Sequence, residues 1–199
     1  MSGQPNVVFM LADNLGYGDL ACFGGSVPTP RLDALAARGM RFTNFNTEAQ
    51  CTPTRGAILT GRMPIRTGTF RVPLPGEPGS YGLAPWEYTL ADMFSDAGYA
   101  TACYGKWHLG NVQGRFPTDQ GFDEWWGISE SSDEASYTSH PLDPPDWETP
   151  KILEAERGHD PTATAEFDLE TRPFMDEGIT DRTVAYIKRK AEAGMPFFI

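Results

Sequence analysis

The chain has 199 residues, of which 40% are apolar and 12% aromatic, and its formal net charge is −11. This balance supports a globular core and excludes wholesale disorder. The acidic excess is confined to residues 117–180, which contain seventeen Asp and Glu against three Lys and Arg. Without a basic surface that could displace counterions, nucleic acid is excluded as a partner. The nearly neutral residues 1–116 can still hold a local anion site.

The N-terminal sequence carries no recognisable targeting segment. The apolar run Val7–Ala12 is too short to span a bilayer, and neither a basic segment nor a small-residue cleavage site flanks it. We therefore expect no signal peptide and no membrane partner. Three cysteines without a CxxC pair favour neither a disulfide framework nor a cysteine-built zinc site. An odd thiol fits a reducing compartment, so we expect the cytoplasm, and a periplasmic or secreted location stays open.

Strand and helix signals alternate along the chain, which predicts an α/β sheet protein. Apolar, β-branched and aromatic runs predict three strands and the beginning of a fourth: Asn6–Ala12, Met40–Asn46, Tyr99–Tyr104 and Pro196–Ile199. Caps, prolines and terminating glycines predict four helices: the stretch between Thr29 and Gly39, Pro53–Gly61, Tyr88–Ala97 and Ile179–Ala193. Thr180 is the expected N-cap of the last helix.

The acidic stretch 117–180 is predicted to be an irregular surface excursion. It contains the proline-rich run His140–Asp146, and its histidines, His140 and His159, match no motif and are expected in solvent. The cluster Glu124–Gly127 contains two tryptophans, so we expect it to be anchored by packing.

The segment Cys51-Thr-Pro-Thr-Arg55 places a cysteine at the start of a predicted helix. The free N–H groups and the dipole of a helix N-terminus favour an anion at that point. Arg55 lies about one turn further on and can bring a planar guanidinium to the same place. The plain alternative is a core cysteine near an ordinary surface arginine.

Two further segments contain polar groups that could act together. In Gly105–Gly110, Lys106 and His108 are two residues apart, so in extended backbone they project to the same side. In the loop after the first predicted strand, Asp13 and Asn14 offer neighbouring oxygens suited to a hard divalent cation. Taken separately, the first is compatible with a solvated loop and the second with a turn-forming pair.

Taken together and in order, these segments resemble the signatures of the type I sulfatases. CTPTR matches the C-x-[SPT]-x-R signature of that family, whose cysteine is oxidised to formylglycine after translation. LADNLGYGDL resembles the family's N-terminal metal loop, and GKWHLG resembles its Lys/His tract. The resemblance covers residues 6 to about 127 and resumes near residues 181–199.

The resemblance implies an alkaline-phosphatase-like α/β sandwich with a central mixed, mostly parallel sheet flanked by helices. Residues 1–199 would form the N-terminal part of a sulfatase catalytic domain that is incomplete at its C-terminus. The implied activity is hydrolysis of sulfate monoesters, as in an arylsulfatase. The implied partners are a small sulfated substrate and, during maturation, a formylglycine-generating enzyme.

The resemblance also assigns roles to individual residues. Asp13, Asn14 and an oxygen of modified Cys51 would bind Ca²⁺, with Mg²⁺ as a second option. Arg55 would steady the formylglycine and the metal site. Lys106 would bind the sulfate and the formylglycine, and His108 would act on the formylglycine hydroxyl.

A hydrated aldehyde at residue 51 would offer one hydroxyl to attack sulfur and a second whose deprotonation expels sulfate. His108 would be the base that removes this second proton.

The sequence departs from the family pattern in two respects. The metal loop has Asp-Asn where the family more often has Asp-Asp, so one formal charge is missing. The family's further functional residues, beginning with a histidine after a Pro-Phe-Phe strand, would follow Ile199. We therefore expect weak or no turnover from these 199 residues alone. Two alternatives stay open: a phosphonate or phosphodiester hydrolase of the same superfamily, and a truncated fragment without catalysis.

Overall fold

The computed structural model describes residues 3–73, 77–139 and 148–199. The chain divides into two compact units. Unit 1 consists of Met1–Phe9 and Glu48–Ile199, and unit 2 consists of Met10–Thr47. The proline-rich run His140–Asp146, which we expected to be a surface excursion, lies outside the described residues.

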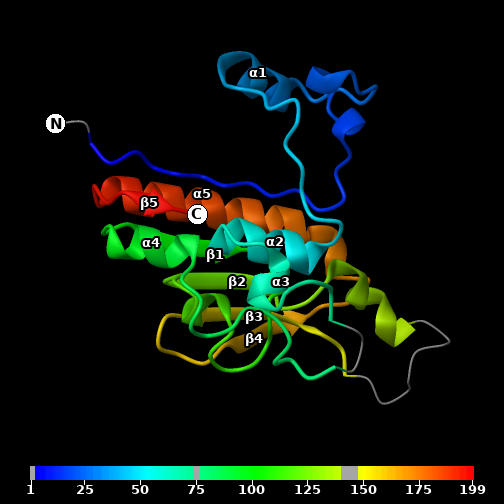
Figure 1. The fold of residues 1–199 in the computed structure, drawn as a ribbon, viewed down its shortest axis with the longest axis vertical. Coiled ribbons are helices and arrows are strands. Elements are labelled where there is room, and N and C mark those ends of the chain that lie inside the picture. Colours follow the sequence, from blue (N-terminus) through cyan, green and yellow to red (C-terminus); the bar gives the residue numbers. More distant parts are fainter. Residues whose placement is uncertain (1–2, 74–76, 140–147) are drawn as a thin grey trace. The chain divides into compact units, whose positions relative to one another are not determined.

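Unit 1 is built on a mixed five-stranded sheet with the strand order β4-β3-β2-β1-β5 (Figure 1). The strands are β1 (Ala100–Tyr104), β2 (Glu124–Ile128), β3 (Lys151–Glu156), β4 (Thr162–Glu166) and β5 (Phe197–Phe198). β1 pairs in parallel with β2 and with β5, whereas β2 with β3 and β3 with β4 pair antiparallel. The predicted α/β class and mixed sheet are confirmed.

Helices cover both faces of this sheet. Because successive side chains of a strand point to opposite faces, β1 contributes to two different cores. Cys103 packs into the core that includes α4 (Leu90–Asp96), whereas Ala100 and Ala102 pack against Tyr186 of α5 (Met175–Glu192). Both helices contact β1, so this strand is covered on both faces.

Local capping signals place most helices correctly. Helix α4 begins with a capping box in which Thr89 and Asp92 each accept the other's backbone N–H. Helix α5 begins at Met175 rather than at Ile179. Thr180 is therefore not its N-cap but an internal residue, and its hydroxyl donates to the carbonyl of Asp176 at 2.7 Å.

The prediction that residues 117–180 are irregular is wrong for three segments, because β2, β3 and β4 all lie within this stretch. Three acidic side chains of these strands are paired: Glu124 with Arg189, Glu154 with Arg182 at 3.0 Å, and Glu166 with Lys151. Charge therefore does not prevent these strands from forming. The expected anchoring of the tryptophan cluster is confirmed, since Trp125 is 1% and Trp126 8% exposed.

The prediction of a buried strand at Asn6–Ala12 is also wrong. Val7 forms a single parallel bridge with Phe198, and Phe9 donates its backbone N–H to the carbonyl of Ile199 at 2.7 Å. Val8 and Phe9 are each 47% exposed. Within unit 1 the segment is thus an extended run beside β5, and its apolar side chains remain largely in contact with solvent.

Unit 2 contains one regular helix, α1 (Pro30–Arg38), and two short 3₁₀ turns at Tyr17–Asp19 and Ala21–Phe23. The helix follows the prediction, with Thr29 before it and Gly39 after it. The predicted strand Met40–Asn46 is absent from this fully described segment, and its large side chains are exposed. Helix signals act locally, whereas a strand needs a hydrogen-bonded neighbour.

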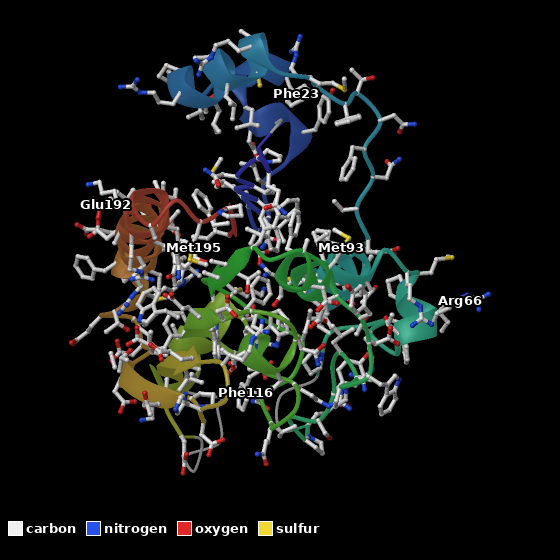
Figure 2. The ribbon with its side chains drawn as sticks, turned by 90° about the vertical axis from the view of Figure 1, so that its left-hand side faces the viewer. Phe23, Arg66, Met93, Phe116, Glu192 and Met195 are labelled. Atoms are coloured by element: carbon white, nitrogen blue, oxygen red, sulfur yellow. The ribbon has the colours of Figure 1, made fainter. Side chains whose placement is uncertain are left out.

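Helix α2 (Cys51–Thr60) is followed at once by the short helix α3 (Pro64–Thr67). Figure 2 shows the side chain of Arg66 pointing away from α3 into solvent.

In the described part of the chain, no helix is both long and apolar enough to cross a membrane.

Candidate active site

Cys51 is the first residue of α2, so the predicted placement at a helix N-terminus is observed. Gln50 is the N-cap residue in extended conformation, and the helix ends at Gly61 in the left-handed conformation, with φ of 65°. Cys51 is half-buried, whereas Thr52 and Pro53 behind it are buried. The N-terminal end of the helix dipole therefore lies at the cysteine, where it favours negative charge.

The tract that contains Lys106 and His108 continues directly from the end of β1. Its backbone runs beside the end of β2: Trp107 donates its N–H to the carbonyl of Ile128, and His108 donates to that of Ser129, each at 2.9 Å. His108 has a φ of 59°, an uncommon value for a residue other than glycine. Such a conformation persists where surrounding contacts enforce it, which is typical of functional sites.

Two side chains of α2 hold the helix against this tract. The Thr52 hydroxyl is buried and donates to the carbonyl of His108 at 2.9 Å. One turn later, the Arg55 guanidinium donates to the carbonyl of Lys106. These contacts join segments more than fifty residues apart in sequence, and they bring the beginning of α2 next to both candidate residues of the tract.

Helix α2 is in turn supported from behind by the segment that follows α3. Gly56, in the middle of α2, is buried, and a Cβ atom placed there would lie 2.4 Å from the Thr69 hydroxyl oxygen. Thr67 and Thr69 share a buried hydroxyl hydrogen bond of 2.8 Å. The glycine therefore permits a close approach that fixes the position of α2.

A second wall of the site follows β2. The Lys106 ammonium donates to the Ser131 hydroxyl at 3.2 Å, and His108 Nε2 lies 3.8 Å from Glu130 Oε2. Burial opposes ionisation of Asp133, but hydrogen bonding to Ser131, with the charges of Lys106 and His108, lowers its pKa below the ordinary value. Lys106 and His108 thus face the same acidic turn.

Two carboxyl groups of this wall are shifted the other way. Burial, followed by repulsion from Glu134, raises the pKa of Glu130 to about 8, although Lys106 opposes the shift. Burial likewise raises the pKa of Glu134 to about 7. Burial therefore favours the protonated form of both carboxyls, which reduces repulsion of an incoming anion.

Sequence reasoning missed Thr52, Glu130 and Ser131. Thr52 was inside the matched CTPTR signature, so its position was available but its contact was not. Glu130 and Ser131 lie in the stretch that we expected to be irregular, and only the pairing of Gly105–His108 with the end of β2 brings them to the site. The glycine within α2 was a usable signal, since glycine in a helix interior usually has a packing reason.

The other two predicted site residues, Asp13 and Asn14, belong to unit 2. They form a bend at the start of the predicted glycine-punctuated loop, where Asn14 has a φ of 55°. Asparagine adopts this left-handed conformation more readily than most residues. Across residues 3–73, 77–139 and 148–199, no group of three or more His, Cys, Asp and Glu side chains is arranged to hold a metal ion.

The remaining cysteines show no sign of reactivity. Burial raises the pKa of Cys103 to about 12, so its thiolate is scarce at neutral pH. Cys22 lies in a 3₁₀ turn of unit 2, where its backbone N–H donates to Asp33 at 2.8 Å.

Comparisons with known proteins identify the family of the chain. The family model "Sulfatase" matches residues 5–199. Arylsulfatase A of Homo sapiens is 41% identical over 188 residues, covering 92% of this chain and 36% of that protein. Arylsulfatase A of Bos taurus is 40% identical over 210 residues, covering the whole of this chain and 40% of that protein. The chain belongs to the sulfatase family.

Solved structures show the same fold. The PsFucS1 sulfatase from Pseudoalteromonas sp. superposes with a TM-score of 0.85 at 29% identity, over 98% of this chain and 43% of that one. The fold is therefore the alkaline-phosphatase-like fold of sulfatases, of which these residues form one part. The chain spans about two fifths of the length of the curated relatives named above.

Proposed function

We propose that the protein to which this chain belongs hydrolyses sulfate monoesters, in the manner of an arylsulfatase, after Cys51 has been converted to formylglycine. The observation that supports this most strongly is the attachment of α2 to the Lys/His tract. Thr52 and Arg55 bond to the carbonyls of His108 and Lys106, so hydrogen bonds join the helix that begins at residue 51 to the tract with the ammonium and the imidazole.

Each residue of this assembly has a physical role in the proposed reaction. The Lys106 ammonium binds the sulfate oxygens and stabilises the negative charge that gathers on them. The Arg55 guanidinium adds positive charge beside residue 51 and holds the tract in place through the carbonyl of Lys106. His108 holds and returns the proton of the reacting hydroxyl, since imidazole exchanges protons near neutral pH.

We further propose that Asp13, Asn14 and the modified side chain of residue 51 contribute oxygen ligands to a Ca²⁺ ion. The donors fit a hard cation, because carboxylate and amide oxygens are the ligands that Ca²⁺ prefers, and Mg²⁺ accepts the same donors. The bound ion would supply positive charge at the reacting sulfate group. Asn14 contributes one negative charge less than a second aspartate would, which favours a weaker site.

The test is hydrolysis of an aryl sulfate by protein produced from its native reading frame together with a formylglycine-generating enzyme. Turnover is expected, and Cys51→Ala is expected to abolish it because no aldehyde can form. Cys22→Ala serves as the matched control, since it removes a thiol in unit 2 and is expected to leave turnover unchanged.

Assays of the same protein with sulfate esters, phosphodiesters and phosphonates decide between the proposed activity and its alternatives. Faster hydrolysis of phosphodiesters or phosphonates than of sulfate esters would replace the proposed activity with that of the related hydrolases. Absence of turnover with every ester, despite an aldehyde at residue 51, would favour a domain that binds without catalysis.

A further inference from the structure

One carboxyl group of the site has no role in the reaction described above. Glu130 Oε2 lies 3.8 Å from His108 Nε2. The His108 side chain is 5% exposed and that of Glu130 is 20% exposed, so solvent screens this pair only weakly. A carboxylate at this distance is close enough to favour the protonated imidazole.

The backbone fixes the position of Glu130 relative to the imidazole. Ser129, the residue before Glu130, accepts the backbone N–H of His108 at 2.9 Å. Ser131, the residue after Glu130, accepts a hydrogen bond from the Lys106 ammonium at 3.2 Å. Glu130 is therefore held from both sides against the same tract, and the Thr52 hydroxyl holds His108 from the direction of α2.

The electrostatic environment raises the proton affinity of the Glu130 carboxyl. Burial and Glu134 raise the pKa of the Glu130 carboxyl to about 8, into the range where an imidazole also exchanges its proton. The charged groups that act on the pair lie on the tract and on the turn after β2: Lys106, Asp133 and Glu134. From α2, the Arg55 guanidinium bonds to the carbonyl of Lys106 in the same tract. Ionisable groups that interact strongly titrate as a pair.

We propose that Glu130 is the positioning residue of His108, orienting the imidazole and balancing its charge whenever it carries a proton. When His108 takes up a proton, the negative charge of the Glu130 carboxylate compensates for the positive charge of the imidazolium. The role in catalysis rests on the proposed function, in which His108 accepts and returns a proton.

The direct test follows the imidazole signals of the chain by NMR between pH 5 and 9. The sequence has three histidines, so His108→Gln identifies the relevant signal. In the unsubstituted chain the His108 signal is expected to shift in two steps, because a shared proton is lost separately from the second one. Glu130→Gln is expected to leave a single step, displaced to lower pH by about one unit.

Glu154→Gln is the matched control, since it also removes one carboxylate but on β3, where its partner is Arg182. It is expected to leave the His108 curve unchanged. Identical His108 curves in the unsubstituted chain and in Glu130→Gln would overturn the proposal. Equal displacement in Glu130→Gln and Glu154→Gln would also overturn it, because the effect would then be one of net charge.

These measurements need no turnover, so their failure is separate from failure of the proposed hydrolysis. In protein that hydrolyses an aryl sulfate, Glu130→Gln is expected to lower kcat by roughly 10- to 100-fold, with KM changed less than about threefold. An unchanged kcat would overturn the catalytic part of the proposal even where the NMR coupling is present.

Discussion

The two units of this chain differ in what holds them together. In unit 1, helices α4 and α5 enclose a five-stranded sheet and bury large side chains such as Trp125 and Tyr186. In unit 2, which the structure describes throughout, none of residues 10–47 is buried. Helix α1 nevertheless forms in unit 2 where its caps predict it, whereas the predicted strand Met40–Asn46 does not. Local signals are thus sufficient for a helix, and strands require tertiary partners.

The largest expected effect is the difference in unfolding free energy between a large-to-small substitution in unit 1 and one in unit 2 of this 199-residue chain. Trp125→Ala is expected to lower the free energy of unfolding by about 3–5 kcal/mol, because it empties a buried site in the main core. Phe45→Ala is expected to change it by no more than about 0.5 kcal/mol, since Phe45 is 72% exposed. Urea unfolding followed by circular dichroism measures both values. A loss of several kcal/mol for Phe45→Ala would remove the distinction between the units.

A smaller effect is expected from paired glycine substitutions. Gly56→Ala is expected to destabilise the chain by about 1–3 kcal/mol, because its Cβ would overlap the Thr69 hydroxyl at 2.4 Å. Gly18→Ala, in unit 2, meets no atom within 4 Å and is expected to be nearly neutral. The same unfolding measurement applies. A neutral Gly56→Ala would show that α2 is not held closely against the segment after α3.

A carboxyl group of unit 1, that of Glu130, is expected to make the stability of the chain depend on pH. Burial raises the pKa of Glu130 from 4.5 to about 8, so the unfolded chain loses this proton first as the pH rises. Stability contributed by the protonated carboxyl is therefore present below about pH 4.5 and lost by about pH 8. Glu130→Gln is expected to reduce the fall in Tm between pH 5 and pH 8.5 by roughly 3–6 °C. An unchanged fall would contradict the buried placement of this carboxyl.

The smallest effect on stability is expected from Asn14→Asp in unit 2, because the residue is exposed and either side chain tolerates its left-handed backbone. If Asn14 is a metal ligand, the added charge is expected to lower the Ca²⁺ concentration needed for half-maximal turnover by several-fold. Chelation by EDTA is expected to reduce turnover, and added Ca²⁺ to restore it. An unchanged Ca²⁺ requirement would argue against coordination by residue 14.

Much of the candidate site could be predicted because its residues form compact sequence motifs. Cys51 and Arg55 lie one helical turn apart on α2, and Lys106 and His108 lie two residues apart in one tract. That tract is not simply extended as predicted, because His108 is left-handed with a φ of 59°. The sequence predicts a helix that begins at Pro53, and the observed helix α2 begins two residues earlier, at Cys51.

The contacts that join these motifs could not be predicted. The bond from Thr52 to the carbonyl of His108 spans fifty-six positions, and no local pattern encodes it. Glu130 reaches the imidazole only because β2 pairs with β1. The acidic composition of residues 117–180 indicates an irregular segment, whereas the alternation of buried and more exposed positions in Lys151–Glu156 indicates a strand. Composition alone therefore does not predict strands that carry acidic side chains.

The most direct test of the central claim is the mass of the peptide that contains Cys51, from chain produced together with a formylglycine-generating enzyme. We predict loss of the sulfur atom and appearance of an aldehyde at residue 51, with Cys22 and Cys103 retained as thiols. An intact thiol at residue 51 under conditions in which a known sulfatase is converted would contradict it.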